Sequence, residues 1–164
     1  VDVDWTLPAY LWFVAVTVTL TLTDIDTKLI PNRILFPGTV VALVLLIGGG
    51  LIEGGPVVRA VAGGAVYFLL LFVVALIARG GFGFGDVKLA FLLGLFATYQ
   101  SWDTLIVAIF AAFLLGGLVS LLLVVFRIRS RKDAIPFGPY LVLGTYVAIA
   151  WAGSISTWYL GAAT

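Results

Sequence analysis

The stretch from Thr104 to Phe126 reads TLIVAIFAAFLLGGLVSLLLVVF and holds no charged side chain over 23 residues. A membrane-spanning helix needs about 20 residues, because each residue rises about 1.5 Å and the hydrocarbon core is about 30 Å thick. Five further uncharged runs lie along the chain: 5–23, 34–52, 60–78, 89–102 and 134–164. The short run 89–102 spans only if the polar residues before it enter the membrane boundary. We predict an all-α integral membrane protein with six transmembrane helices and short loops, a single domain over residues 1–164.

The overall composition is also that of a membrane protein. Hydrophobic residues make up 63% of the chain and charged residues 10%, whereas about a quarter of the residues of a soluble domain are charged. The chain has no histidine and no cysteine, which excludes Ser–His and Cys–His catalysis, thiolate metal sites and zinc hydrolysis of the HExxH kind. We therefore expect no metal and no cofactor. The net charge of +1 gives no reason to expect nucleic-acid binding.

The basic residues predict the orientation in the membrane. With six spans, only Arg59 lies on one side. The other eight basic residues share the opposite side: Lys28, Arg33, Arg79, Lys88, Arg127, Arg129, Arg131 and Lys132. The positive-inside rule makes this second side cytoplasmic and places both termini outside, as expected of a multi-pass protein of the cytoplasmic membrane. Five spans with a re-entrant segment at 89–102 would divide the basic residues less cleanly.

Glycine and proline mark the connection between the second and third spans. We expect Gly48, Gly49 and Gly50 to close the second helix. Gly54, Gly55 and Pro56 should then form a tight turn into the third helix.

Two of the eight acidic residues stand at the ends of uncharged runs on the cytoplasmic side. Asp24 follows the first run, and Asp86 precedes the fourth. Ionisable groups at such depth are costly and indicate function. Two carboxyl groups in a partly desolvated site resist ionising together, so they can share a proton. This is the arrangement of an aspartic protease, in which one carboxylate activates water and the other polarises the scissile carbonyl.

The segment before Asp86 alternates glycine with aromatic residues. It reads GGFGFGD over residues 80–86, with glycine at Gly81, Gly83 and Gly85. Because glycine allows close approach to the backbone, this segment could present its backbone to an extended substrate. An ordinary loop that ends in a helix-capping aspartate is the alternative. A phosphate-binding loop is a poor match, since no Gly-Lys-Ser/Thr follows.

Three stretches together resemble the type IV prepilin peptidases. Residues 24–32, DIDTKLIPN, are similar to the D-x5-I-P-[DN] signature of that family, residues 81–88, GFGFGDVK, to its G-x-G-x-G-D-x-K signature, and residues 135–139 to its IPFGP stretch. The resemblance implies an intramembrane aspartyl endopeptidase of the GxGD type. Such an enzyme removes the basic leader of prepilins, pseudopilins or archaellin precursors at the cytoplasmic membrane face, and its catalytic pair here would be Asp24 and Asp86.

The remaining motif residues receive supporting roles from this resemblance. Lys88 would compensate the charge of Asp86 or hold an acidic residue of the substrate. The alternative is that Lys88 only marks the cytoplasmic side, as basic residues near membrane spans commonly do. Ile30, Pro31 and Asn32 should shape the loop and start the second helix. Asp26 stands where many relatives have a basic residue, and we interpret it as a supporting acid, not a catalytic one.

The expected partners are a prepilin-like precursor and the lipid bilayer, and the sequence predicts no oligomeric state. The N-terminal extension with paired cysteines that methylates the new N-terminus in bifunctional relatives has no counterpart here, so we expect cleavage without methylation. A presenilin-like protease is a further alternative, although neither its Tyr-Asp pair nor its Pro-Ala-Leu motif is found. A small ion-coupled transporter that uses paired intramembrane aspartates, or a non-catalytic assembly subunit, is also compatible with the sequence.

Overall fold

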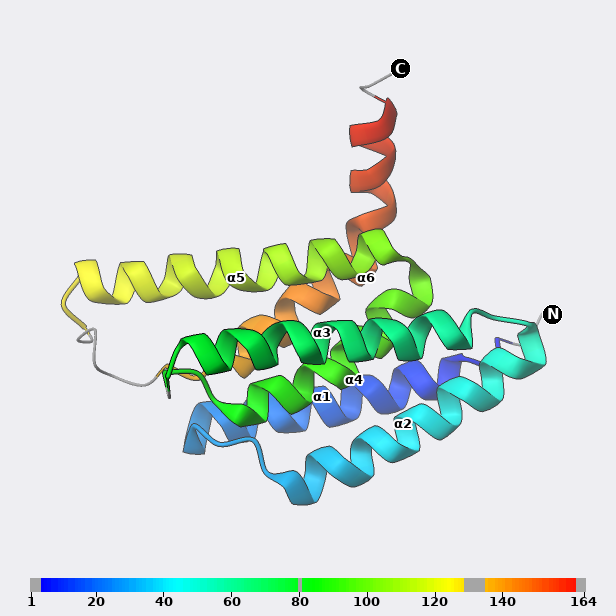
Figure 1. Cartoon of the computed structure of the whole chain (residues 1–164), viewed down its shortest axis with the longest axis horizontal. Coiled ribbons are helices and arrows are strands. Elements are labelled where there is room, and N and C mark those ends of the chain that lie inside the picture. Colours follow the sequence, from blue (N-terminus) through cyan, green and yellow to red (C-terminus); the bar gives the residue numbers. More distant parts are fainter. Residues whose placement is uncertain (1–3, 80, 129–134, 162–164) are drawn as a thin grey trace.

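The computed structural model describes residues 4–79, 81–128 and 135–161, and these residues form six α-helices (Figure 1). The helices are α1 (Leu7–Thr27), α2 (Asn32–Glu53), α3 (Val57–Ile77), α4 (Phe84–Gln100), α5 (Trp102–Val125) and α6 (Gly138–Gly161). Helices α1 to α5 run alternately in opposite directions. The α1–α2 and α3–α4 connections, the end of α5 and the start of α6 therefore lie at one end of the bundle, which we call the three-loop end (left in Figure 1).

Four of these helices are long and apolar enough to cross a membrane: α1, α2, α3 and α5. Their outward faces carry exposed large apolar side chains, such as Val44, Leu76 and Phe110, as expected for surfaces that contact lipid. Helix α4 has 17 residues, and the apolar part of α6 is the short stretch Gly138–Trp151. The last turns of α6 project away from the other helices (Figure 1). The prediction of an all-helical fold is thus confirmed.

Helix α4 occupies the centre of the bundle. It packs against α2, α3, α5 and α6, and most of its residues from Asp86 to Thr98 are buried. Because other helices surround it, α4 does not need the lipid-facing apolar surface that the outer helices carry. This central position explains how α4, which is short and only moderately apolar, can be part of a membrane-embedded helix bundle.

Glycines bring α3 and α4 into close contact. A Cβ atom at Gly94 of α4 would lie 2.7 Å from the carbonyl oxygen of Gly63 and 2.8 Å from the α-carbon of Gly64. A Cβ atom at Gly64 would in turn lie 2.9 Å from the carbonyl oxygen of Phe91. Such contacts between small residues allow two helix backbones to approach closely, which is a common way of packing helices in membranes.

Two helix ends differ from the predicted boundaries. The uncharged run 5–23 ends before Asp24, but α1 continues to Thr27; likewise, the run 89–102 begins after Asp86, but α4 already begins at Phe84. The acidic residues mark the edge of the apolar stretch, whereas the helix continues until its backbone hydrogen bonding stops. Both aspartates therefore lie inside helices, where their side chains have fixed directions.

The predicted end of the second helix at Gly48–Gly50 is wrong. Helix α2 continues to Glu53 and ends at Gly54, which has the left-handed conformation with φ +67°. A side chain at Gly49 would overlap the backbone carbonyl of Trp5. This glycine thus permits close packing inside α2, and the turn that follows at Gly54, Gly55 and Pro56 agrees with the prediction.

Basic residues in the left-handed conformation follow the helices that end at the three-loop end. Lys28 follows α1 with φ 55°, Arg79 follows α3 with φ 46°, and Arg127 follows α5 with φ 55°. The N–H group of Lys28 donates a hydrogen bond to the carbonyl oxygen of Asp24 at 2.8 Å. A positive charge at a helix C-terminus interacts favourably with the helix dipole. Residues 129–134, which hold part of the predicted basic cluster, lie outside the described residues.

At the opposite end, Arg59 of α3 holds the C-terminus of α4. Its guanidinium group donates hydrogen bonds to the carbonyl oxygens of Thr98 at 2.9 Å, Tyr99 at 2.7 Å and Gln100 at 2.8 Å. The last carbonyl groups of a helix have no partner within the helix, so these bonds satisfy them. The single basic residue predicted on this side therefore has a structural role.

Candidate active site

Asp24 lies in the last turn of α1, at the three-loop end. Its side chain is only 4% exposed, and its Oδ2 atom has no hydrogen-bond partner of ordinary geometry in the part of the chain that the structure describes. Gly138, the first residue of α6, lies directly against this carboxylate. An acceptor so buried and so little satisfied is costly in a folded protein, which favours a functional explanation.

Asp86 lies in the first turn of α4 and is 7% exposed. The cap of this helix is Gly83, whose missing Cβ would lie 3.1 Å from Oδ2 of Asp86. The alternative that Asp86 itself caps the helix is therefore wrong, because the helix begins two residues earlier. Asp86 begins α4 at the same end of the bundle at which Asp24 ends α1, and the side chain of Ile30 lies near the neighbours of both aspartates. The structure thus brings together the two acids that the sequence singled out.

Ile30 connects the surroundings of the two aspartates. A Cβ atom at Gly85, the residue before Asp86, would lie 3.0 Å from the Cβ atom of Ile30. A Cβ atom at Gly138 would lie 3.3 Å from the Cδ1 atom of the same isoleucine and 2.6 Å from Oδ2 of Asp24. The side chain of Ile30 therefore fills the space between the start of α4 and the start of α6.

Aromatic side chains join the connections at the three-loop end. The rings of Phe82 and Phe137 have their centres 5.3 Å apart, and Phe113 of α5 lies 5.4 Å from Phe137. Contacts of this kind add packing energy beyond the burial of area alone. The glycine-rich segment before Asp86 and the IPFGP stretch, which leads into the first residues of α6, are thereby held against each other.

The other motif residues lie around this centre. Pro31 precedes α2 as its cap residue and Asn32 is its first residue. The Lys88 ammonium group donates a hydrogen bond to Oδ1 of Asn32 at 3.2 Å. Gly81 and Asp26 are exposed.

Sequence reasoning missed two residues of this site. Gly138 belongs to the IPFGP motif, which predicts no role for it, although it lies against Asp24. Tyr67 of α3 belongs to no motif. It is fully buried, its hydroxyl group has no described hydrogen-bond partner, and the charge of Asp86 acts on it. A lone tyrosine in an apolar run is only a weak indication of function. A polar side chain within a predicted span is nevertheless a candidate functional residue, and this is the one signal in the sequence that points to Tyr67.

The arrangement suits acid–base chemistry on a bond that reaches the membrane surface. Two buried carboxyl groups with interacting charges can hold one proton between them, so that one acts as base and the other as acid. Among the described residues, no group of three or more acidic residues could hold a metal ion.

Comparison with known proteins shows the family of this chain. Residues 11–121, which contain both aspartates, match the type IV leader peptidase family. The chain belongs to this family. The resemblance based on the sequence motifs is thereby confirmed.

Individual members of the family are similar over most of this chain. The prepilin leader peptidase/N-methyltransferase of Aeromonas hydrophila is 33% identical over 158 residues, which is 95% of this chain and 53% of that protein. The protein of the same description from Bacillus subtilis (strain 168) is 31% identical over 151 residues, 90% of this chain and 57% of that protein. The chain thus spans about half the length of these relatives. No solved structure matches it.

Proposed function

We propose that this member of the type IV leader peptidase family is an aspartic endopeptidase that cleaves the leader peptide of prepilin-like precursors, such as pilins, pseudopilins or archaellins. The observation that carries the proposal is the pairing of Asp24 and Asp86. They come from separate motifs, one at the end of α1 and one at the start of α4, yet both are buried at the three-loop end, where Ile30 lies near the residues next to them.

The reaction we propose is hydrolysis of one amide bond by the two carboxyl groups together. The ionised carboxylate accepts a proton from water, and the water oxygen forms a bond to the scissile carbonyl carbon. The protonated carboxyl group meanwhile donates a hydrogen bond to the carbonyl oxygen. The C–N bond breaks as the leaving nitrogen takes up a proton, and the site returns to its starting state. We assign the acid and base roles to the pair and not to either residue.

The proposed setting is the cytoplasmic face of the cell membrane. All six helices would span the bilayer as one domain, with both termini outside and the three-loop end in the cytoplasm, in accord with the distribution of Lys and Arg. Peptide bonds inside a lipid-embedded helix are shielded by their own hydrogen bonds. A site at the boundary can instead meet water and an unwound backbone, and its negative charge would attract a basic leader.

Cleavage of a prepilin-like substrate by purified variants tests this proposal. Asp24→Asn and Asp86→Asn should each lower the rate about 10²-fold or more, the contribution of general acid–base catalysis. Asp103→Asn is the matched control: Asp103 is exposed in the first turn of α5, at the opposite end of the bundle, and its change should leave the rate intact. Full activity of either site variant would remove that aspartate from the mechanism.

Reconstitution in liposomes separates the proposal from ion transport. A peptidase should cleave its substrate without coupled ion flux. Flux that depends on Asp24 and Asp86, with no cleavage of any precursor, would contradict the proposed function.

A further inference from the structure

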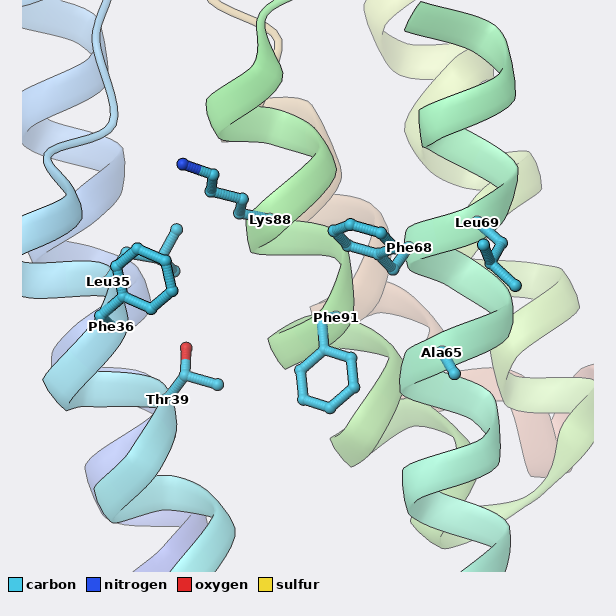
Figure 2. Close-up of a pocket in the computed structure, with 8 residues that line it drawn as sticks. All are labelled: Leu35, Phe36, Thr39, Ala65, Phe68, Leu69, Lys88 and Phe91. Atoms are coloured by element: carbon cyan, nitrogen blue, oxygen red, sulfur yellow. The ribbon is translucent and has the colours of Figure 1, made fainter.

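A groove lies between α2, α3 and α4 on the surface of the bundle. Its volume is about 400 Å³. Phe36 and Thr39 of α2 form one wall, Phe68 and Leu69 of α3 the other, and Phe91 of α4 lies between them (Figure 2). Phe36 and Leu69 are each 56% exposed, so the groove opens on the surface that faces lipid. Its lining is almost entirely apolar.

The ammonium group of Lys88 lies at one end of this groove. Lys88 extends from α4 toward α2 (Figure 2), and its ammonium group lies 5.4 Å from the ring centre of Phe36 and 5.2 Å from that of Phe84. Its only hydrogen bond in the described part of the chain goes to the neutral side chain of Asn32. Aromatic faces and an amide stabilise a cation but do not neutralise it. The ammonium group is therefore available to an anion.

We propose that this groove binds an anionic phospholipid, with an acyl chain between α2 and α3 and the headgroup phosphate on Lys88. The apolar lining matches the chain, and the cation at the membrane boundary matches the phosphate. A protein helix is a poorer fit. With side chains a helix is about 10–12 Å across, so a volume of 400 Å³ holds only about one turn of it. The inference does not depend on the proposed peptidase activity.

Native mass spectrometry of the purified protein tests the headgroup preference. The probes are phosphatidylglycerol and phosphatidylcholine with identical palmitoyl and oleoyl chains. The wild type should retain phosphatidylglycerol about fivefold better, the factor that corresponds to about 1 kcal/mol for one basic residue. Lys88→Gln should abolish this preference and Lys88→Arg should keep it. Lys28→Gln, which changes an exposed lysine at the same end, should have no effect. Equal retention of both lipids by the wild type would overturn the proposal.

A second variant tests the acyl-chain site without changing any charge. Ala65 lines the groove, so Ala65→Trp should fill it and lower the retention of both lipids. Val66→Trp is the control, because Val66 is 46% exposed on the same helix but does not line the groove. Unchanged lipid retention by a folded Ala65→Trp variant would contradict the proposal.

Photocrosslinking identifies the occupant in the membrane itself. A benzophenone amino acid at position 39 should give lipid adducts, since Thr39 lines the groove. Adducts with protein alone would overturn the lipid proposal and indicate a helix of a partner or substrate. This measurement decides the matter even if the Lys88 variants fail to fold.

Discussion

The α-carbon of Gly138 packs directly against the carboxylate of Asp24, so that a methyl group in its place would lie 2.6 Å from Oδ2. The two residues belong to opposite ends of the sequence, at the start of α6 and the end of α1. Any side chain at position 138 must therefore displace the carboxyl group or move α6. Helix α6 thus helps to position one of the two proposed catalytic acids.

Gly138→Ala should impair cleavage more than it impairs folding. Displacing a reacting group by about 1 Å can cost about 10²-fold in rate, and we expect a loss of kcat of that order with a smaller change in KM. Steady-state kinetics on a prepilin-like substrate measure both. Gly117→Ala is the control, because nothing lies within 4 Å of the added methyl group. Wild-type kcat in a folded Gly138→Ala variant would refute the positioning role.

Ile30 variants should show a graded loss of activity. Ile30→Val removes the Cδ1 atom that lies near Gly138 but keeps Cβ and Cγ1, the two atoms nearest to Gly85, whereas Ile30→Ala removes most of the spacer. We expect the cleavage rate to fall in the order wild type, Ile30→Val, Ile30→Ala. The valine variant should lose at most about 1.5 kcal/mol of unfolding free energy, the upper end of the usual range for Ile→Val, because Ile30 is only half-buried.

An exposed isoleucine of the same segment provides the control for this series. Ile25 of α1 is 54% exposed, so Ile25→Ala should change neither the rate nor the stability. Equal activity of wild type and Ile30→Ala would show that the spacer is dispensable.

Tyr67→Phe should separate activity from stability. Its hydroxyl group is buried without a described partner, so its removal should leave the melting temperature unchanged or raise it. If the hydroxyl group donates to Asp86 or to the reacting carbonyl, the rate should fall about tenfold, the worth of one hydrogen bond. Thermal unfolding and cleavage assays on the same preparation test this. A rate equal to that of the wild type would exclude the hydroxyl group from the reaction.

Tyr146 supplies the opposite behaviour as a comparison. Its hydroxyl group forms a hydrogen bond with the hydroxyl group of Thr17. Tyr146→Phe should therefore lower the melting temperature without lowering the intrinsic cleavage rate.

Gly94→Ala should destabilise the bundle. The added methyl group would lie 2.7 Å from the carbonyl oxygen of Gly63, in a contact between two helix backbones that cannot easily move apart. Overpacking of this kind costs about 1–3 kcal/mol, and unfolding in detergent micelles measures it. Gly48→Ala, with open space around the added methyl group, should be neutral or stabilising by up to about 1 kcal/mol because alanine is the better helix former. Equal stability of the two variants would argue against the close α3–α4 contact.

The sequence alone predicted that Asp24 and Asp86 lie at the same end of the helix bundle. Charges interrupt apolar runs where the chain leaves the membrane, and consecutive antiparallel helices then assign Asp24 and Asp86 to the same end. Hydropathy contains no information on the lateral order of helices, however. The central position of α4 and the contact of Gly138 with Asp24 could therefore not be predicted.

Some lateral information was nevertheless present in the small residues. Gly63 and Gly64 in one predicted span and Gly94 in the next are the kind of pattern that marks close helix packing. The glycines at 48–50 were misinterpreted because glycine both ends helices and permits close contacts within them. Only the position of Trp5, far away in the sequence, distinguishes the two roles at Gly49.

Folding stability and membrane insertion make opposite demands on the three left-handed residues Lys28, Arg79 and Arg127. For such residues the backbone conformation costs about 1 kcal/mol or more, which glycine would avoid. Their positive charges, in contrast, direct the insertion of the nascent chain. A screen for heat resistance in detergent should therefore enrich glycine at these three positions, while growth of a host that depends on correctly inserted enzyme should eliminate the same variants.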